Sequence, residues 1–419
     1  MANKAWTNQS KSLEGVQVFG SGLEKQIREI LGWRGGKVTY DSKRGYQVQV
    51  DAAFPSLSRP QVVASVTYTN PDTPGHSNEN KFHLKVGEVA LLKNTFPDVK
   101  TVLILGGTAE AWIPYVLRAF TNFFDEVIFL WEPQGQTRVK EIAADPTTVK
   151  SKHDEFWAFV RKEWASRQLA PDNAPAPHSE VRYGILDELK AQAPVVHNPA
   201  LIRNEVARIC MQRSFDADGA EWSSYIAGQW GNIEMSRSFF NPVEATVEMT
   251  LTQIGVAFEG SIARNVPVPS LLHDLGMRGT RLSEDFVLFS EHLGQPVYIQ
   301  CKASGGGREN HGKNIQNRAK EQITRSLLYS CRSKDGQTVT WAAKGFHWIS
   351  VLDGNWGVTK RQPLKYLHML QMAGYDMIFP ASALLSPTLE VLGAKSPLAM
   401  YLIEVLHCRM AAKSGLRLA

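Results

Sequence analysis

The chain has 419 residues, 43% hydrophobic and 21% charged, a composition that excludes a largely disordered chain and leaves room for two domains. Its formal net charge of +5 suits a polyanionic partner without requiring one. The four cysteines form no CxxC pair, no apolar run approaches the roughly 20 residues of a membrane helix, and Met1–Trp6 lacks a signal-peptide core, so we expect a cytoplasmic protein without zinc ribbon, disulfides or membrane contact.

The first part of the chain predicts an α/β domain. Leu23, Ile27, Ile30 and Leu31 have helical spacing, and Gly32 ends the helix. The strands expected next are residues 37–40, 46–51, 61–69, 102–105 and 126–130, with helices at residues 81–93 and 109–124. This order is typical of a mixed sheet, and we assign it to residues 1–135.

The middle of the chain lacks strand patterns. Residues 137–167 have a charged, helical pattern, and the proline-containing segment 168–179 predicts a linker. Short amphipathic helices are expected over residues 180–240. We therefore expect residues 136–240 to form a helical bridge between two domains.

The element order of the first domain recurs over residues 241–419. A helical spacing spans Val243–Ala263 and contains Glu259. Strands are expected at residues 285–289, 296–302, 346–352 and 375–379, and helices at residues 313–329, 361–373 and 396–412. A second α/β domain is the expectation.

Constant offsets indicate that the two domains are copies of one fold. A separation of 235 residues relates five pairs: Glu24 and Glu259, Ser65 and Gln300, Thr67 and Lys302, His76 and His311, and Lys85 and Lys320. Asp51 and Asp285 are 234 residues apart, a difference that a hairpin turn absorbs. The sequence thus predicts two tandem mixed-sheet domains.

The second copy carries a pattern suited to metal chemistry. Asp285 and Gln300 lie on the two strands of a predicted hairpin, and Lys302 lies on the same face of its strand as Gln300. Two oxygen ligands suit Mg²⁺, and a lysine beside them suits an attacking water. Glu284 precedes Asp285, and the sequence leaves open which of the two is the ligand.

The first copy lacks this set. Asp51 is present, but Ser65 and Thr67 replace the amide and the lysine, and neither supplies a charge. We therefore expect Glu24, Asp51, Ser65 and Thr67 to form a degenerate second site. The alternative is that Lys81, Lys85 and Glu88 of the following helix substitute for the missing groups.

These residues resemble the PD-(D/E)xK nuclease superfamily, over about residues 244–380 with its active-site pattern and about 19–131 by element order. Gln300-Cys301-Lys302 is similar to the QxK variant of Mrr-type restriction nucleases. The resemblance implies two restriction-endonuclease-like domains. It also implies Mg²⁺ held by Asp285, Gln300 and the Cys301 carbonyl, Lys302 activating the water, and Glu259 as a supporting acid.

The resulting hypothesis is a type II restriction enzyme of a restriction-modification system. It would hydrolyse phosphodiesters of double-stranded DNA at specific sites to 5′-phosphate ends, as a homodimer on a palindromic target. Gln300–Lys334 has eight Lys/Arg against two Glu, a local +6 that suits a phosphate track. The expected DNA contacts are Arg278, Arg281, Arg308, Asn310, His311, Lys313, Arg318 and Lys320.

Three alternatives remain open from the sequence. The same fold also serves DNA repair and structure-specific nucleases, since fold alone does not determine function. A DNA-binding protein whose nuclease site has lapsed is a second alternative. The third rests on Val102–Glu110, a strand, glycine turn and helix that would suit a nucleotide or S-adenosylmethionine, without a phosphate-binding lysine or GxGxxG.

Overall fold

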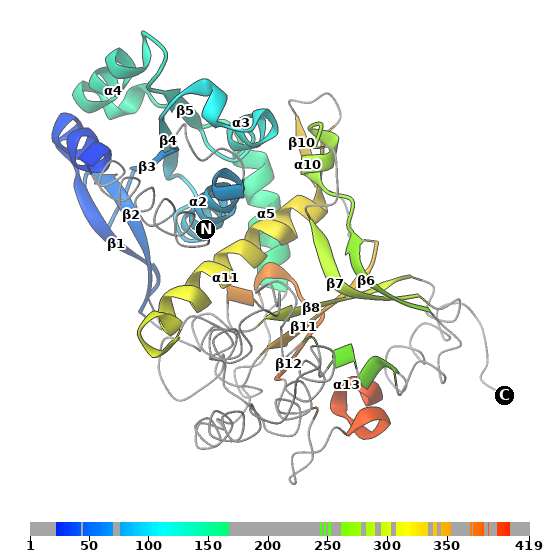
Figure 1. Ribbon diagram of the computed structural model, residues 1–419. Helices are drawn as coiled ribbons and strands as arrows, with labels where there is room; N and C mark the ends of the chain where they lie inside the picture. The colour runs from blue at the N-terminus through cyan, green and yellow to red at the C-terminus, as the bar shows by residue number, and fades with distance from the viewer. Residues whose placement is uncertain are drawn as a thin grey trace, which may run out of the picture. The chain divides into compact units, whose positions relative to one another are not determined.

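The computed structural model of the chain describes most residues of two sheets and their helices (Figure 1). The described residues are 22–42, 45–69, 76–166, 261–277, 282–289, 295–302, 307–333, 338–341, 345–352, 372–380 and 392–402, with isolated positions at 244, 247–248, 250–252, 369–370 and 384, and side chains of residues 307–316 excepted. The expected linker and the bridge from residue 168 to 240 lie outside these residues.

The chain divides into two compact units. The first unit comprises Met1–Ser166, Pro269–Gly279 and Lys320–Ala342. The second unit comprises Arg167–Val268, Thr280–Ala319 and Ala343–Ala419. The segments predicted as one charged helical stretch after residue 136 form α4 (Gly135–Ala144) and α5 (Asp154–Ser166), and both belong to the first unit.

The first unit contains a five-stranded mixed sheet in the order β1-β2-β3-β4-β5. Its first three strands are antiparallel neighbours, and β4 and β5 continue in parallel. The strand bounds are Arg34–Asp41, Tyr46–Phe54, Val62–Tyr68, Lys100–Gly106 and Glu126–Phe129. The five strands expected for the first domain are confirmed.

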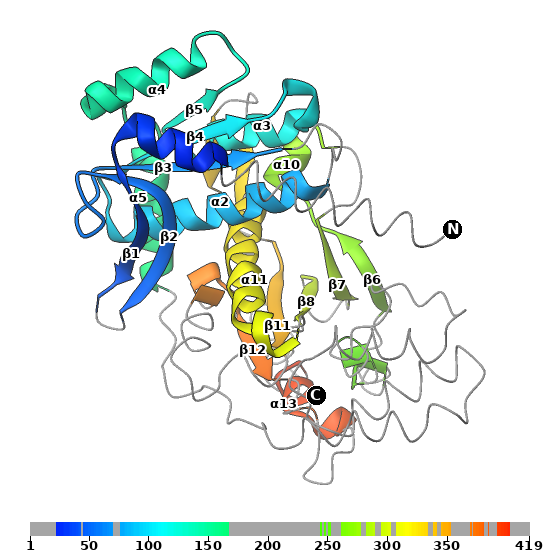
Figure 2. The same cartoon turned by 60° about the vertical axis from the view of Figure 1, so that its left-hand side comes forward.

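Helices cover both faces of this sheet, because the strands bury alternating apolar side chains on each side. On one face, Ile27 of the helix at residues 22–31 and Val139 and Ile142 of α4 pack against Ala64 and Ile104. On the other lie α2 (His76–Thr95), α3 (Pro114–Thr121) and α5. Figure 2 shows α2 lying against this sheet.

The second unit contains a sheet with the same plan, in the order β6-β7-β8-β11-β12. Here too the first two pairings are antiparallel and the last two parallel. The strand bounds are Ser261–Pro267, Ser283–Phe289, Val297–Lys302, His347–Leu352 and Met377–Pro380. A helix follows the third strand in each case, α2 in the first copy and α11 (Gly307–Ser330) in the second. Two copies of one topology are therefore present, as the offsets predicted.

The structure departs from the predictions at several elements. The helix expected up to Ala263 is wrong at its end, because β6 begins at Ser261 and pairs Ala263 with Val287. Residues 109–124 form a short 3-10 turn at Ala109–Ala111 followed by α3, divided at Pro114. The short elements that were not predicted are α10 (Leu271–Asp274), β9 (Cys331–Ser333), β10 (Val339–Trp341) and the 3-10 turns Pro146–Thr148 and Gly393–Lys395.

The C-terminal helix was predicted over residues 396–412. Of the predicted C-terminal helix, the structure shows α13 (Pro397–Met400), capped by the Ser396 hydroxyl. Among the described residues, no helix combines the length and the apolar character needed to cross a membrane.

Candidate functional site

The pairing of β7 with β8 brings the predicted acid and amide together. Phe286 pairs with Ile299, so Asp285 lies opposite Gln300 on the same face of the hairpin. The Gln300 amide donates to Oδ2 of Asp285, and the backbone N–H of Cys301 donates to the same oxygen over 2.6 Å. Asp285 is thus fixed against the strand that carries the amide and the lysine.

The remaining groups of the predicted site divide between the two faces of the hairpin. Lys302, two residues after Gln300, lies at the partly exposed end of β8 and forms no ion pair with a described residue. Glu284 is fully buried and accepts a hydrogen bond from the Trp348 indole at 3.1 Å. Because neighbouring residues of a strand point to opposite faces, Asp285 and not Glu284 is the acid that faces Gln300.

A serine that the sequence analysis missed lies next to Gln300. β8 and β11 run in parallel and pair Gln300 with Ser350, which places both side chains on one face. Ser350 is fully buried, and within the described part of the chain its hydroxyl has no hydrogen-bond partner. Buried hydroxyls are almost always satisfied, so this one marks a place where a water or a ligand oxygen belongs. Its only signal in the sequence was a serine near the middle of a mostly apolar strand, His347–Leu352.

Cys301 takes no part as a nucleophile. Its side chain is buried on the face opposite Gln300. Burial first, and the charge of Asp285 second, raise the pKa of the Cys301 thiol well above its usual value. The thiol therefore stays protonated, and only the backbone of Cys301 contributes to the site.

Glu259, the acid predicted to support the metal, lies outside the described residues, and Glu244 is an acid that the structure places near Cys301. Glu244 is in a helix, contacts Arg264 at 3.4 Å, and lies close enough for its charge to act on Cys301. Glu24 of the first unit has the matching position, since it is also in a helix before the sheet and its charge interacts with that of Asp51.

The first copy repeats the hairpin geometry with different side chains. Asp51 Oδ2 accepts the backbone N–H of Val66 at 2.7 Å, as Asp285 accepts that of Cys301. Ala52 pairs with Ala64, so Asp51 lies opposite Ser65. Ser65 in turn pairs with Leu103, where the second copy pairs Gln300 with Ser350. The two polar residues Gln300 and Ser350 of the second copy thus correspond to Ser65 and Leu103 of the first copy, of which only Ser65 is polar.

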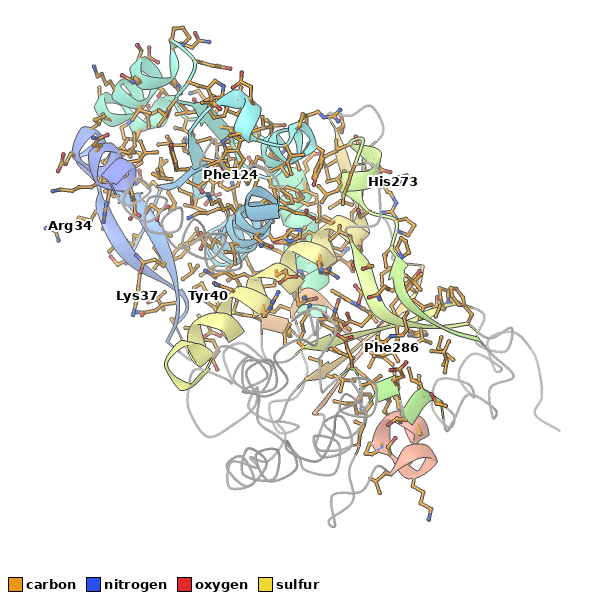
Figure 3. The ribbon with its side chains drawn as sticks, viewed as in Figure 1. Arg34, Lys37, Tyr40, Phe124, His273 and Phe286 are labelled. Atoms are coloured by element: carbon orange, nitrogen blue, oxygen red, sulfur yellow. The ribbon has the colours of Figure 1, made fainter. Side chains whose placement is uncertain are left out.

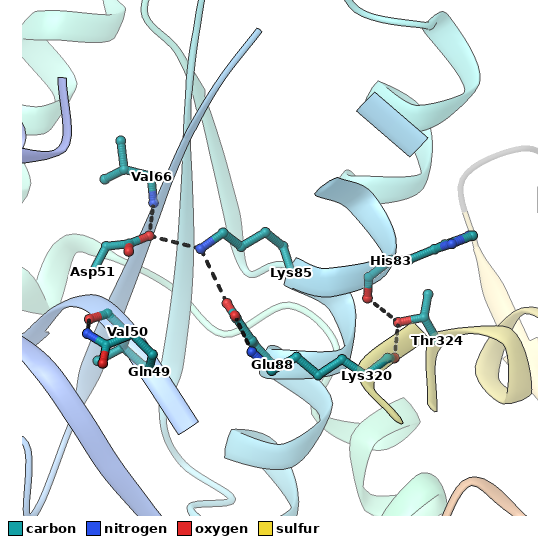
Figure 4. A network of polar contacts seen from close by, with 9 residues as sticks. All are labelled: Gln49, Val50, Asp51, Val66, His83, Lys85, Glu88, Lys320 and Thr324. Carbon is teal, nitrogen blue, oxygen red and sulfur yellow. Dashed lines mark hydrogen bonds and ion pairs between the residues drawn. The ribbon is translucent and has the colours of Figure 1, made fainter. Parts of the chain in front are cut away.

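Lys85 of α2, the helix that follows β3, contacts the carboxylate of Asp51 (Figure 4). The Lys85 ammonium lies 3.0 Å from Asp51 Oδ2 and 3.3 Å from Glu88 Oε2. Glu88 also contacts the Lys320 ammonium at 2.8 Å, from the part of α11 that belongs to the first unit. Of the three helix residues that the sequence named as possible substitutes, Lys85 lies beside Asp51 with Glu88 next to it, and Lys81 donates to the Tyr68 carbonyl, while Thr67 remains a partly buried strand residue.

Electrostatics favour the charged forms of Lys85 and Glu88 and the neutral form of Glu24. Burial opposes the charge on Lys85, but Glu88 and Asp51 outweigh it and raise the pKa of Lys85. Burial likewise acts to raise the pKa of Glu88, and the two lysines outweigh it and lower that pKa. Burial and then the charge of Asp51 raise the pKa of Glu24. Asp51 and Glu88 are therefore neutralised by protein ammonium groups.

The predicted DNA contacts have varied positions. Arg278 and Arg281 lie outside the described residues, and Arg308, Asn310, His311 and Lys313 are in α11 with side chains that the structure does not describe. Arg318 is exposed. Lys320 is buried and bound to Glu88, so it stabilises the contact of α2 with α11 instead of facing a phosphate.

The space beside the glycine turn after β4 is occupied by other residues of the protein. A Cβ at Gly107, whose φ is +101°, would lie 2.5 Å from the Thr69 carbonyl oxygen. The Gly106 carbonyl accepts the Trp112 indole N–H at 3.1 Å. These glycines therefore serve close packing of the turn.

The described residues contain no cluster of three or more His, Cys, Asp or Glu able to hold a metal ion. Asp285, Gln300 and the Cys301 carbonyl still fit Mg²⁺, because this ion is commonly held by one or two carboxylates while waters and substrate phosphates complete its shell. The unsatisfied Ser350 hydroxyl beside Gln300 agrees with such a hydrated site. Comparison of the chain with protein families, curated proteins and solved structures gives no match.

Proposed function

We propose that this protein is a Mg²⁺-dependent endonuclease that hydrolyses double-stranded DNA at specific sequences, a type II restriction enzyme with a PD-(D/E)xK-like site. The observation that carries the proposal is the hydrogen-bonded pair of Asp285 and Gln300, with Lys302 two residues further on the same strand. The strand order shared by both sheets supports the tandem restriction-endonuclease-like architecture.

Each group has a distinct task in this mechanism. Asp285, Gln300 and the Cys301 carbonyl would hold the ion, and the Cys301 N–H fixes the orientation of the Asp285 carboxylate. A bound Mg²⁺ supplies Lewis acidity at the phosphate and lowers the pKa of a water. Lys302 orients the attacking water and offsets charge as it develops on the phosphate. The products carry 5′-phosphate ends.

With one complete site among the described residues of each chain, cleavage of both strands calls for a homodimer. In the first unit Lys85 and Lys320 neutralise the acids, and Ser65 and Thr67 offer neither an amide nor a lysine. One chain therefore cuts one strand, and two chains related by a two-fold axis cut both strands of a palindromic site.

Purified protein incubated with supercoiled plasmid and Mg²⁺ tests the proposal. Discrete linear fragments are the expected product, while cutting of flaps or junctions alone would indicate a repair nuclease.

Lys302→Ala and Asp285→Asn should abolish cleavage, and Lys302→Ala should retain DNA binding. The exposed residues Lys162 and Asp98 provide matched controls, Lys162→Ala and Asp98→Asn, which should cut normally. Binding without cutting by the wild type would instead identify a DNA-binding protein with a lapsed site.

A further inference from the structure

The hairpin of β1 and β2 extends beyond the sheet of the first unit as a two-stranded ribbon. β2 pairs with β3 only through Ala52–Phe54, whereas it pairs with β1 from Tyr46 to Ala53. Residues 46–51 of β2 therefore have β1 as their only sheet neighbour among the described strands. Figure 1 shows this ribbon continuing past the end of β3.

The two faces of the ribbon differ sharply in chemistry. The inner face buries Val38, Tyr40, Tyr46, Val48 and Val50. The outer face presents two directly opposed pairs, Lys37 with Gln49 and Thr39 with Gln47. Lys37, Gln47 and Gln49 are exposed, and Thr39 is partly exposed. No described strand pairs with β1 on its free edge.

The ribbon is held rigidly from behind. The Thr95 hydroxyl, in the last turn of α2, donates to the Tyr40 carbonyl at 2.5 Å. Tyr40 and Tyr46 pack with ring centroids 6.3 Å apart, which ties the two strands together near the turn. On the outer face, the Gln47 amide donates to the Thr39 hydroxyl at 3.3 Å. A rigid face loses little conformational entropy when it binds.

The net positive charge of the ribbon favours an anionic partner. Residues 34–50 contain the cations Arg34, Lys37, Lys43 and Arg44 against the single acid Asp41, a net charge of +3 from four minus one. Arg34 and Lys37 are exposed and form no ion pair with a described residue. Figure 3 shows both on the outer side of the hairpin, with Tyr40 on the inner side. These charges are therefore available to a polyanion.

The shape and side chains of the ribbon match one groove of double-stranded DNA. The major groove, about 12 Å wide, admits a two-stranded β-ribbon. At the base edges in this groove, guanine accepts hydrogen bonds from lysine, and adenine forms two hydrogen bonds with glutamine. We propose that the outer face of the β1–β2 ribbon enters the major groove, with Lys37 and Gln49 contacting base edges and Arg34 a phosphate. This inference rests on the proposed function, and it assigns DNA recognition to the unit without the complete catalytic set.

Binding of duplex DNA measured with Ca²⁺ in place of Mg²⁺ tests the ribbon without cleavage. Lys37→Ala/Gln49→Ala should weaken binding to a labelled target duplex by about tenfold and reduce the salt dependence by about one counterion. The matched control is Gln136→Ala/Lys140→Ala, an exposed glutamine–lysine pair on α4, which packs beside β5 at the other edge of the sheet. This control should bind as the wild type does. Unchanged melting temperatures would show that both variants fold.

The outcomes separate the two proposals. If the wild type cuts DNA and the ribbon variant binds and cuts at wild-type levels, the ribbon inference fails while the nuclease proposal stands. If the wild type binds duplex but never cuts, and the ribbon variant loses binding, the nuclease proposal fails alone. A ribbon variant that is monomeric where the wild type is dimeric would overturn the inference, because the face would then join two copies of the chain.

Discussion

At the scale of single residues, Ser350 links stability with activity. Its hydroxyl is buried beside Gln300 and lacks a partner within the described structure, and an unsatisfied buried hydroxyl costs about 1–3 kcal/mol. Ser350→Ala should therefore raise the free energy of unfolding by about 1 kcal/mol, and it should slow cleavage because a ligand or water oxygen loses its contact. Urea unfolding and single-turnover cleavage measure the two effects. A variant that is less stable and fully active would show that the hydroxyl is an ordinary core contact.

Lys81 gives the protein a pH dependence in the alkaline range. Burial lowers the pKa of Lys81 to about 8, from 10.5, and its ammonium donates to the Tyr68 carbonyl. Between these two values the unfolded chain keeps a proton that the folded protein has released, so stability rises with pH through this window. Lys81→Met removes the titration.

The measurement is the difference in melting temperature between wild type and Lys81→Met across pH 7 to 10. We expect the wild type to gain relative to the variant as pH rises above about 8. A difference that stays constant over this range would mean that the Lys81 pKa is the same in the folded and unfolded states.

Some site residues were predictable and others were not, for a physical reason. Asp285 and Gln300 lie on adjacent strands of one hairpin, so period-two alternation and a short turn were enough to bring them together. Lys85, which the sequence offered only as an alternative, and Ser350, which it did not indicate, reach their positions through packing of separate elements. Apolar spacing continues smoothly into Ala263 and does not show where the helix ends, so the start of β6 at Ser261 was missed.

At the scale of elements, a buried ion pair joins three segments of the first unit. Lys93 of α2 contacts Asp125 at 2.7 Å, and the exposed fractions of the two side chains are 1% and 0%. Asp125 also accepts the backbone N–H groups of Thr101 in β4 and Lys152 before α5. Asp125→Leu should cost about 3–5 kcal/mol of unfolding free energy, since it leaves the Lys93 charge buried and unpaired.

Urea denaturation of a double variant provides the control for this pair. Lys93→Met/Asp125→Leu removes both charges, and it should recover a large part of the loss because an apolar pair of similar volume needs no counter-charge. If the double variant were as unstable as Asp125→Leu, the hydrogen bonds to Thr101 and Lys152 would carry the stability instead of the ion pair.

Strands with a clear apolar or alternating pattern were predicted, whereas β6, expected as the end of a helix, and the three-residue strands were missed. All five strands of the first sheet were expected, whereas β9 and β10 have three residues each and carry no periodic signal. The contact between α2 and α11 was equally hidden. It depends on Gly87, where a Cβ would lie 2.6 Å from the Lys320 carbonyl oxygen, and a lone glycine inside a helical pattern does not indicate which segment packs against it.

At the scale of the whole chain, two copies of one topology hold corresponding aspartates with different polar partners. The same backbone hydrogen bond positions Asp51 and Asp285, which shows how closely the two hairpins correspond. In the first copy a lysine ammonium faces Asp51, and in the second an amide faces Asp285. An ammonium group neutralises a carboxylate permanently, whereas an amide leaves the charge for an external cation. We therefore expect the two copies to differ in whether they bind a metal ion.

This difference predicts how many divalent ions the chain binds. Titration with Mn²⁺ in a calorimeter should give a single ion per chain for the wild type, and Asp285→Asn should remove it. Asp51→Asn should leave the binding unchanged, because Lys85 and not a metal occupies the space beside Asp51. Lys85→Met exposes the uncompensated charge of Asp51 near Glu88 and Glu24, so this variant should gain a second, weaker ion. Loss of Mn²⁺ binding in Asp51→Asn with retention in Asp285→Asn would place the metal in the first unit and reverse the assignment of the catalytic copy.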